Sequence, residues 1–338
     1  MKAIGIYEAQ STDHPEVFHE VELPVPSASG RDLLIKVRAV GVNPVDTKVR
    51  KSVTDRLEEI KVLGWDAVGV VEVVGSEVSL FEVGDEVYYA GSITRSGCNS
   101  EYHLVDERIV GRKPQSLSDL EAAAMPLTTI TAWEALFERL LISSSGESEG
   151  QSIVIIGGAG GVGSIAIQLA KQLAKLKVIA TASRKDTVDW CKQMGADECI
   201  NHHEDLVAQL KSLGHETVDY VLCLNSTDSH WDAIAQMIKP QGKICTIVEN
   251  SHPLDQSVLK NKSTTHVWEL MFTKAMYETD DMQSQHDLLN QAADLFDQGI
   301  LKTTFTQEIG VLSVENLTKA HAQLESGSTI GKVAMTVS

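Results

Sequence analysis

Hydrophobic and polar residues alternate along the chain in two different patterns. Up to about residue 111, short apolar stretches rich in Val, Ile and Tyr are separated by Gly, Pro, Asp and Ser, which is typical of β-strands. We expect strands at residues 3–7, 33–42, 67–74, 86–91 and 101–105. The first third of the chain is therefore predicted to form a β-rich unit with few helices.

The pattern becomes helical over residues 119–141, and after Ser152 strands alternate with amphipathic helices. Apolar runs predict strands at 152–157, 177–182, 220–224, 243–248 and 264–271, and helices that begin near Val162, Thr187, His203 and His230. Such an alternation predicts a doubly wound parallel sheet, so the fold class is α/β. The strand at 264–271 is expected at the edge of that sheet.

The last sixty or so residues return to a mixed pattern. A helix at 285–300, a strand at 303–311, a helix at 314–326 and a strand at 332–337 are predicted, and they could rejoin the β-rich unit. The serine-rich stretch 142–152 has the composition of a domain linker, but it directly precedes the first strand of the α/β part. We expect it to be an exposed surface loop.

Length and charge narrow the class of protein. A chain of 338 residues is long enough for two domains, and a net charge of −18 without a basic tail argues against nucleic acid or an anionic membrane as partner. The five cysteines are scattered without a CxxC pair, and no apolar run is long enough to span a membrane. We expect a complete cytoplasmic protein.

The most informative motif is the glycine-rich stretch 157–163, GGAGGVG, between a predicted strand and a predicted helix. A GxGxxG frame in this context is typical of dinucleotide-binding proteins: one glycine allows the turn, one the approach of a pyrophosphate, and one the packing of helix on strand. The predicted cofactor contacts are Gly158, Ala159, Gly160, Gly161, Val162 and Gly163. The alternative is a tight turn that binds no ligand.

The residues after the second strand of the α/β part predict which dinucleotide binds. NAD-dependent enzymes have an Asp or Glu there, whereas this chain has Ser183, Arg184 and Lys185, which favour the 2′-phosphate of NADPH. Asp186 is interpreted as the N-cap of the next helix. His202 and His203, after the third strand, could flank the same phosphate, but these basic residues could equally be ordinary surface groups.

With these motifs in view, the chain resembles the medium-chain dehydrogenase/reductase superfamily, in its zinc-free quinone oxidoreductase-like branch. The resemblance covers nearly the whole length and rests on segments at 39–46, 63–75, 84–88, 122–136, 150–171 and 331–337. It implies a GroES-like catalytic domain (1–126 and 280–338) around a Rossmann NADPH-binding domain (127–279).

The resemblance also implies roles for single residues. Asn43, the catalytic candidate, and Thr131 would approach the nicotinamide, while Ser183, Arg184, Lys185 and His202 would hold the 2′-phosphate; Trp65 and Asn99 would line the substrate pocket. Asn43 and Asn99 could instead be turn residues, and Asp46 and Asp66 are expected to be structural caps. Zinc-dependent relatives have Cys at position 43 and His at position 65, so no metal is predicted. A site improvised from Cys98, His103 and Asp106 is the remaining alternative.

Without a metal to activate an alcohol, reduction of an electrophilic acceptor is the expected chemistry. The predicted function is transfer of hydride from NADPH to a quinone or an activated enone. Two alternatives remain open, an enoyl-thioester reductase and a non-catalytic NADPH-binding redox sensor. A homodimer is expected, with no nucleic acid or membrane partner.

Overall fold

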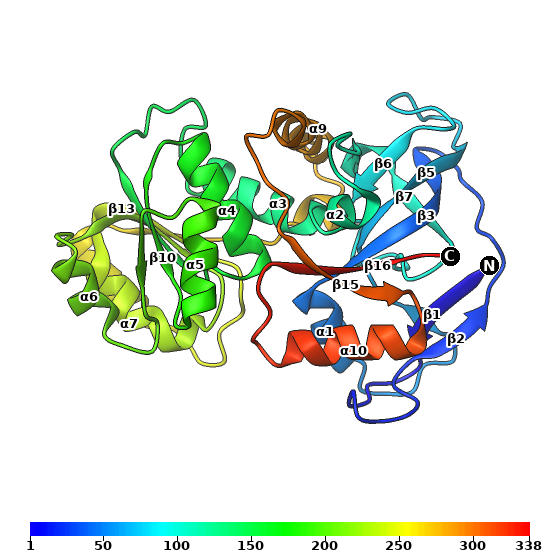
Figure 1. The fold of residues 1–338 in the computed structure, drawn as a ribbon, viewed down its shortest axis with the longest axis horizontal. Coiled ribbons are helices and arrows are strands. Elements are labelled where there is room, and N and C mark those ends of the chain that lie inside the picture. The colour runs from blue at the N-terminus through cyan, green and yellow to red at the C-terminus, as the bar shows by residue number, and fades with distance from the viewer. The chain divides into compact units, whose positions relative to one another are not determined.

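The computed structural model describes all of residues 1–338, and the chain forms two compact units. The β-rich unit contains Met1–Ile130 and Phe272–Ser338, and the α/β unit contains Thr131–Met271. The β-rich unit is therefore built from both ends of the chain, as Figure 1 shows by the blue and red strands that it combines.

The β-rich unit has a sheet of seven strands and a smaller sheet of three. The small sheet has the order β2-β1-β4, and the large one has the order β15-β16-β3-β5-β6-β8 with β7 also paired to β3. The bounds are β1 (Lys2–Ile6), β2 (His19–Glu22), β3 (Asp32–Val42), β4 (Lys61–Val62), β5 (Asp66–Val74), β6 (Glu86–Tyr89), β7 (Tyr102–Asp106), β8 (Val110–Arg112), β15 (Phe305–Val311) and β16 (Lys332–Thr336). The strands predicted in the first third of the chain are all present.

The C-terminal strand returns to the β-rich unit, as the sequence suggested. Strand β16 pairs antiparallel with β3, with Val333 opposite Val42, and parallel with β15. Its residues from Lys332 to Met335 are buried, so its apolar run forms part of the core beside β3. This pairing places Lys332, the first residue of β16, near the end of β3.

Six helices belong wholly or partly to the β-rich unit. They are α1 (Pro44–Lys51), α2 (Asp119–Ala123), α3 (Pro126–Trp133), α8 (Thr273–Tyr277), α9 (Ser284–Asp297) and α10 (Val314–Glu325), with a 3₁₀ turn at Glu107–Ile109. The single helix predicted for residues 119–141 is divided in the structure. The helical pattern of residues 119–141 is interrupted before Pro126 because proline cannot donate a helical hydrogen bond. A π-helical turn, Glu134–Arg139, follows α3 in the α/β unit.

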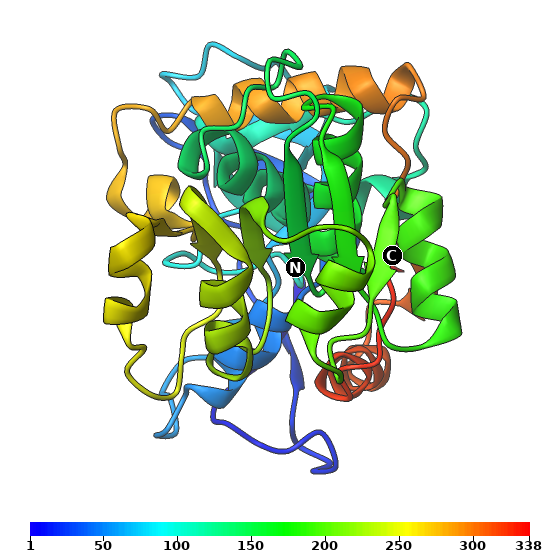
Figure 2. The same cartoon turned by 90° about the vertical axis from the view of Figure 1, so that its left-hand side faces the viewer.

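The α/β unit is a doubly wound sheet of six parallel strands in the order β11-β10-β9-β12-β13-β14. Figures 1 and 2 show helices α4 and α5 on one face and α6 and α7 on the other. The bounds are β9 (Ser152–Ile156), β10 (Lys177–Thr181), β11 (Glu198–Ile200), β12 (Val218–Cys223), β13 (Ile238–Thr246), β14 (Thr265–Trp268), α4 (Gly161–Gln172), α5 (Lys185–Met194), α6 (Leu206–Ser212) and α7 (Thr227–Met237), with a 3₁₀ segment at Gln256–Lys262.

This topology confirms the predicted α/β fold class, and β14 is an edge strand, as expected. Strand β9 lies in the middle of the sheet, and all five of its residues are buried. The reversal of strand order beside β9 creates the kind of switch point at which open α/β sheets bind ligands. No helix of the structure combines the length and the apolar character that a membrane crossing requires.

Candidate functional site

The glycine-rich turn leaves β9 and enters α4 with only glycine at its sharpest point. Gly157 has a φ of +88°, a conformation that residues with a side chain rarely adopt, and its N–H donates to Thr181 Oγ1 over 3.0 Å. Gly160 is the N-cap of α4, and no side chain caps the helix start. The first N–H groups of α4, and the positive end of its dipole, therefore remain available for an anion.

The three glycines of the GxGxxG frame differ in what surrounds them. A Cβ atom on Gly158 would lie 2.8 Å from Ala180 Cβ, and one on Gly163 would lie 2.3 Å from the carbonyl oxygen of Gly157. A Cβ on Gly160 would meet nothing closer than 3.6 Å, and the backbone there, with φ −73° and ψ 174°, suits any residue. Packing within the protein thus requires glycine at 158 and 163 but not at 160.

The space outside Gly160 therefore fits a ligand that must come close to the backbone. The neighbouring Ala159, Gly161 and Val162 are partly exposed around this space. A pyrophosphate placed there would accept hydrogen bonds from the N–H groups at the start of α4. The open space at Gly160 and the uncapped start of α4 are compatible with the dinucleotide site that the sequence predicts, which stays a prediction.

Two basic residues follow strand β10, at the position that distinguishes dinucleotides. Ser183 is partly exposed, and the Arg184 side chain is 47% exposed, with its Nε 3.3 Å from Asp186 Oδ1. The Lys185 ammonium instead pairs with Asp189, one turn further along α5. Arg184 is therefore better placed than Lys185 to contact a phosphate beside β10.

The interpretation of Asp186 as a helix N-cap was wrong. Arg184 occupies the N-cap position of α5, and its backbone N–H donates to Thr187 Oγ1 over 3.1 Å. Asp186 lies within the first turn, where its carboxylate accepts from the N–H of Thr187. Because Thr187 Oγ1 accepts the N–H of Arg184, the helix begins at Lys185, two residues earlier than an N-cap at Asp186 would allow.

Three histidines gather near Arg184. The rings of His202 and His203 lie 4.4 Å apart, and the pKa of His202 is lowered by burial and by the positive charges of His203, His230 and Arg184. The Nδ1 atom of His202 is buried without a hydrogen-bond partner. A bound anion would favour the charged forms of these histidines. The sequence suggested His202 and His203 as neighbours of a phosphate, but not His230.

In the β-rich unit, four buried polar side chains surround the N-cap of α1. The Asn43 Nδ2 donates to Asp66 Oδ2 over 2.8 Å, and the Lys332 ammonium donates to Asn43 Oδ1 over 2.5 Å and to Asp66 Oδ2 over 3.2 Å. Because an ammonium only donates, these contacts determine which end of the Asn43 amide carries oxygen. These contacts use one of the two N–H groups of Asn43 Nδ2, and the Asn43 side chain is completely buried.

Both acids of this cluster also receive backbone N–H groups at helix starts. Asp46 Oδ2 accepts from the N–H of Asn43 over 2.8 Å, and Asp66 Oδ1 accepts from the N–H of Leu127 in α3 over 2.7 Å. The structural role expected for both acids is thus what the hydrogen bonds show. Burial raises the pKa of Asp46 to about 7 and raises the pKa of Asp66, which Lys332 and Asn43 partly counteract.

Comparison with known proteins identifies the family. Residues 29–115 match the family of alcohol dehydrogenase GroES-like domains, and residues 194–335 match that of zinc-binding dehydrogenases. A zinc-type alcohol dehydrogenase-like protein of Staphylococcus epidermidis is 44% identical over 336 residues, which cover 99% of each chain. The chain belongs to the medium-chain dehydrogenase/reductase superfamily.

Solved structures agree with this family and with its quinone oxidoreductase-like branch. A Rhizobium etli protein named after zinc-dependent alcohol dehydrogenases is 47% identical with a TM-score of 0.94, over 99% of this chain and 98% of that one. The quinone oxidoreductase of Coxiella burnetii is 28% identical with a TM-score of 0.82; the match covers 100% of this chain and 99% of that one. As a medium-chain dehydrogenase/reductase, the protein is an oxidoreductase.

Several of these relatives are named after zinc, but the residues of this medium-chain dehydrogenase/reductase do not fit a catalytic zinc. Trp65 offers no ligand atom, Asn43 is engaged by Lys332 and Asp66, and the ammonium of Lys332 already partners the Asp66 carboxylate. Nowhere in residues 1–338 do three His, Cys, Asp or Glu side chains come together as a metal site. No step of the chemistry is therefore assigned to a metal.

The alternative site from three scattered residues of the β-rich unit is not assembled. Their side chains have other partners: Cys98 Sγ bonds to the Asp66 carbonyl, His103 lies between Tyr89 and Ser96, and Asp106 pairs with Arg108. Burial lowers the pKa of His103 to about 4, so its ring is neutral at pH 7. These residues stabilise the β-rich unit rather than form a binding site.

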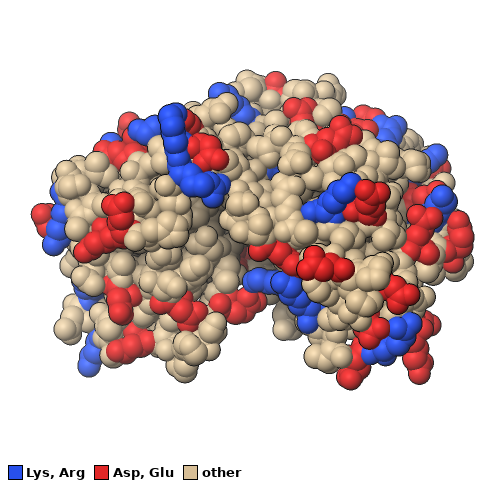
Figure 3. All heavy atoms as spheres, turned by 60° about the horizontal axis from the view of Figure 1, so that its bottom comes forward, with Lys and Arg blue, Asp and Glu red and all other residues tan.

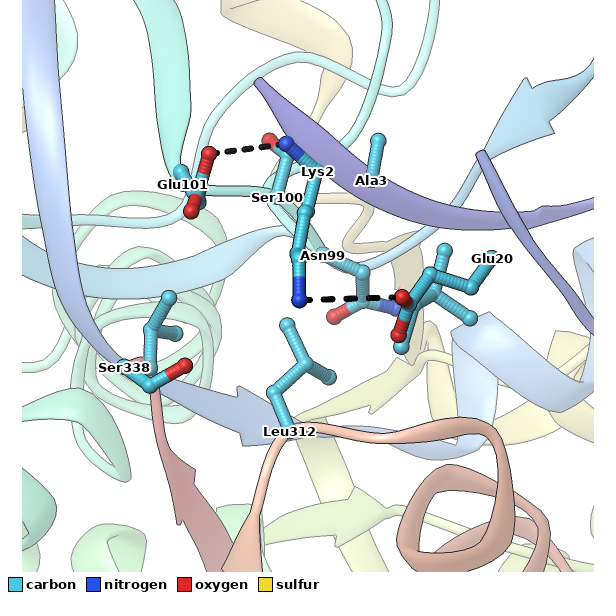
Figure 4. Close-up of a pocket in the computed structure, with 10 residues that line it drawn as sticks. Lys2, Ala3, Glu20, Asn99, Ser100, Glu101, Leu312 and Ser338 are labelled. Carbon is cyan, nitrogen blue, oxygen red and sulfur yellow. Dashed lines mark hydrogen bonds and ion pairs between the residues drawn. The ribbon is translucent and has the colours of Figure 1, made fainter. Parts of the chain in front are cut away.

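The residues expected to line a substrate pocket lie in different surroundings. Trp65 is completely buried, with its Nε1 donating to Ser92 O over 3.0 Å and its ring packed edge-on against Phe272. Asn99 lines a small pocket of about 50 Å³ that also contains Lys2, Glu20 and Leu312 (Figure 4). Thr131, in α3, is 4% exposed. Trp65 is not among the residues that line the small pocket beside Asn99.

Lys332 is the main site residue that sequence reasoning missed. The only signal was a lysine at the start of the apolar run 332–337. A lysine in that position usually extends to solvent, and only the pairing of β16 with β3 brings its ammonium to Asn43 and Asp66. On the face shown in Figure 3, acidic and basic side chains are scattered without a continuous basic surface.

Proposed function

We propose that the protein is an NADPH-dependent oxidoreductase that transfers hydride to a quinone or an activated enone without a catalytic zinc. The observation that carries this proposal is the surroundings of Gly160. Packing within the protein leaves room for a side chain at this position, whereas a bound pyrophosphate would need that space. Bound NADPH supplies the hydride. The residues of this chain bind and orient the cofactor and hold the acceptor.

The preference for NADPH is supported by the basic cluster after β10. Arg184 follows β10, and His202 and His203 follow β11; we expect the 2′-phosphate of the ribose to reach them, since no carboxylate occupies the position of Ser183. A mycobacterial protein with 25% identity and a TM-score of 0.84 was solved in complex with NADPH. Charge-assisted hydrogen bonds to the 2′-phosphate would give the discrimination.

The class of acceptor is supported by the Asn43 cluster and by two relatives. Lys332 and Asp66 hold the Asn43 amide in one orientation. Its second N–H would donate to a carbonyl oxygen that gains negative charge during hydride transfer. The Coxiella burnetii relative is a quinone oxidoreductase, and a 2-methylene-furan-3-one reductase of Solanum lycopersicum is 38% identical over 198 residues. Both names describe conjugated carbonyl compounds.

A homodimer through the edge strand β14 is part of the proposal. Trp268 is 47% exposed and Leu270 is 49% exposed at this edge, and an unpaired strand with apolar side chains favours pairing with a second copy. Light scattering coupled to size-exclusion chromatography should give twice the chain mass of 36.8 kDa. A monomer at micromolar concentration would contradict this part.

The decisive experiment compares two glycine variants. Gly160→Ala should fold like the wild type, because its Cβ meets nothing within 3.6 Å, yet should bind NADPH far more weakly. Gly163→Ala should destabilise the fold, because its Cβ would lie 2.3 Å from the backbone of Gly157. Unchanged NADPH affinity in a well-folded Gly160→Ala would overturn the cofactor site.

The acceptor is tested by NADPH consumption with a panel of quinones, enones, aldehydes and an enoyl thioester. Turnover with quinones or enones supports the proposal. Turnover restricted to the thioester would make the protein an enoyl-thioester reductase. Tight NADPH binding without turnover on any compound would replace the enzymatic proposal with a redox sensor.

A further inference from the structure

Two cysteines of the α/β unit lie where helix α5 packs against the edge strand β11. Cys191 on α5 is fully buried, whereas Cys199 on β11 is partly exposed. Cys199 Sγ lies 3.9 Å from the carbonyl oxygen of Val188, which precedes Cys191 by three residues on the same helix face. Each of the two thiols shifts the pKa of the other. The remaining cysteines, Cys98, Cys223 and Cys245, are buried.

The local chain path brings the two thiols together. Helix α5 ends at Gly195, whose φ of +112° reverses the chain, and the N–H groups of Gly195 and Ala196 bond to Lys192 O and Cys191 O over 3.0 Å each. The chain then passes directly into β11, which carries Cys199. The two cysteines are therefore positioned by a tight helix-to-strand connection and not by distant contacts.

The surroundings make Cys199 the more reactive of the two thiols. The neighbouring Cys191 thiol and the positive charge of the exposed Lys192 lower the pKa of Cys199, while the Cys199 thiol and burial raise the pKa of Cys191. A partly exposed thiol with a lowered pKa next to a second thiol is typical of redox-sensitive cysteine pairs. Cys199 would react first, and Cys191 would resolve the product.

Cys191 also contacts the glycine-rich turn. A Cβ on Gly158 would lie 3.1 Å from Cys191 Sγ, so this sulfur packs against the first glycine of the frame. A second link runs from Trp190, the residue before Cys191, to the N-cap of α4. Trp190 Nε1 donates to Ser164 Oγ, which in turn donates to the carbonyl oxygen of Gly160, each over 2.7 Å. A shift of α5 would therefore be transmitted to the turn.

We propose that Cys191 and Cys199 form a reversible disulfide that weakens dinucleotide binding at the glycine-rich turn. The oxidant is a peroxide. The Cys199 thiolate attacks one peroxide oxygen and breaks the O–O bond, which gives a sulfenic acid and, with hydrogen peroxide, one water. The Cys191 thiol then displaces the hydroxyl group as a second water, so two thiols are oxidised and one peroxide is reduced.

The disulfide disturbs the turn because of its length. An S–S bond is about 2.05 Å long, much shorter than the separation of two sulfur atoms that are not bonded, so one or both sulfur atoms must move. Movement of Cys191 Sγ removes its contact with Gly158, and movement of α5 pulls on the Trp190 and Ser164 link. The consequence for NADPH rests on the proposed function, whereas disulfide formation does not.

The first experiment maps the disulfide in the full-length protein. After treatment with hydrogen peroxide and blocking of free thiols, mass spectrometry should find a peptide that joins Cys191 to Cys199, which dithiothreitol removes and which Cys199→Ser lacks. Lys192→Gln should slow the oxidation roughly threefold, since the thiolate fraction falls. Lys211→Gln removes an exposed lysine of α6 and is the charge-matched control; it should not change the rate of oxidation. Oxidation of Cys199 beyond the sulfenic acid without a disulfide would overturn the proposal.

The second experiment measures the NADPH affinity of the same samples. The oxidised wild type should have a Kd roughly tenfold higher than the reduced protein, with recovery after dithiothreitol, and Cys199→Ser should show no change with peroxide. An unchanged Kd in a fully disulfide-bonded sample would refute the coupling. If the reduced protein does not bind NADPH, the proposed function fails, while the peptide map still decides whether the disulfide forms.

Discussion

The ammonium of Lys332 lies 3.2 Å from Asp66 Oδ2, and both side chains are at most 4% exposed. This pair connects the first residue of the last strand with the first residue of β5. The same ammonium contacts Asn43 Oδ1, so a single cation stabilises a buried carboxylate and orients the candidate catalytic amide. A buried charge pair of this kind is costly to break on one side only.

Removal of the cation should therefore destabilise the protein. Lys332→Met leaves Asp66 buried without a counter-charge, and the free energy of unfolding at pH 7 should fall by about 3–5 kcal/mol, as measured by urea unfolding. The loss should shrink at lower pH, because Asp66 can then become neutral. The double variant Lys332→Met with Asp66→Asn should regain part of the stability. Equal losses in the single and double variants would contradict the pairing.

Arg184 should determine the choice of dinucleotide. One charge-assisted hydrogen bond contributes about 1.5–3 kcal/mol, so Arg184→Gln should reduce the preference for NADPH over NADH at least tenfold. Lys185→Gln is the matched control, since Lys185 pairs with Asp189, and it should have a smaller effect. Kinetics with both cofactors will measure this. Equal efficiency of the wild type with NADPH and NADH would reject the assignment.

The histidines should make NADPH binding pH-dependent. Burial and neighbouring positive charges lower the pKa of His202 in the free protein, and a bound phosphate would raise it again. The affinity for NADPH relative to NADH should therefore increase as the pH falls from about 8 to 6.5. His202→Asn should flatten this dependence in titrations followed by tryptophan fluorescence. A pH profile that the substitution leaves unchanged would exclude His202 from the phosphate site.

Activity should not require a metal. The side chains around Asn43 offer no zinc ligand set, and the Lys332 ammonium takes the place of a cation beside Asp66. Exhaustive dialysis against a chelator should leave kcat and KM for the best acceptor unchanged, with metal content measured by elemental analysis. Stoichiometric zinc, together with activity lost on its removal and regained on its return, would refute this prediction.

A buried acid pair in the α/β unit should affect stability. Glu269 lies 2.8 Å from Arg139 Nε beside the fully buried Glu134, and burial and Glu134 raise the pKa of Glu269 above its ordinary value of 4.5. An acid with a raised pKa in the folded chain favours folding less as the pH rises above its ordinary pKa. The free energy of unfolding should therefore decrease between about pH 5 and 8.

Glu269→Gln removes this titration and should flatten the decrease, with a more stable protein at pH 8. Glu138→Gln is the control, because Glu138 also approaches Arg139 but is 28% exposed. Urea unfolding at several pH values gives the slopes. A slope that Glu269→Gln leaves as steep as that of the wild type would show that this acid does not titrate between the folded and unfolded states.

The sequence alone determined most of the longer elements and their order. Apolar periods located five of the six strands of the α/β unit and the C-terminal return, because burial of one face or both faces of an element leaves a pattern in the local sequence. The three-residue edge strand β11 is too short to show such a pattern. The glycine-rich turn between β9 and α4 was predictable for the same reason, since strand, glycines and helix are neighbours in the chain. Arg184 and Ser183 could be placed by their distance from that turn.

Only the tertiary structure decided which polar groups meet. Lys332 is 289 residues from Asn43, and Asp66 is 23 residues from it, yet the three share one buried hydrogen-bond network. The distinction between Gly160 and Gly163, the contact of Cys191 with the turn, and the position of His230 near His202 likewise follow from packing. Such contacts depend on the pairing of distant segments and on the exclusion of water, and neither leaves a periodic signal in the sequence.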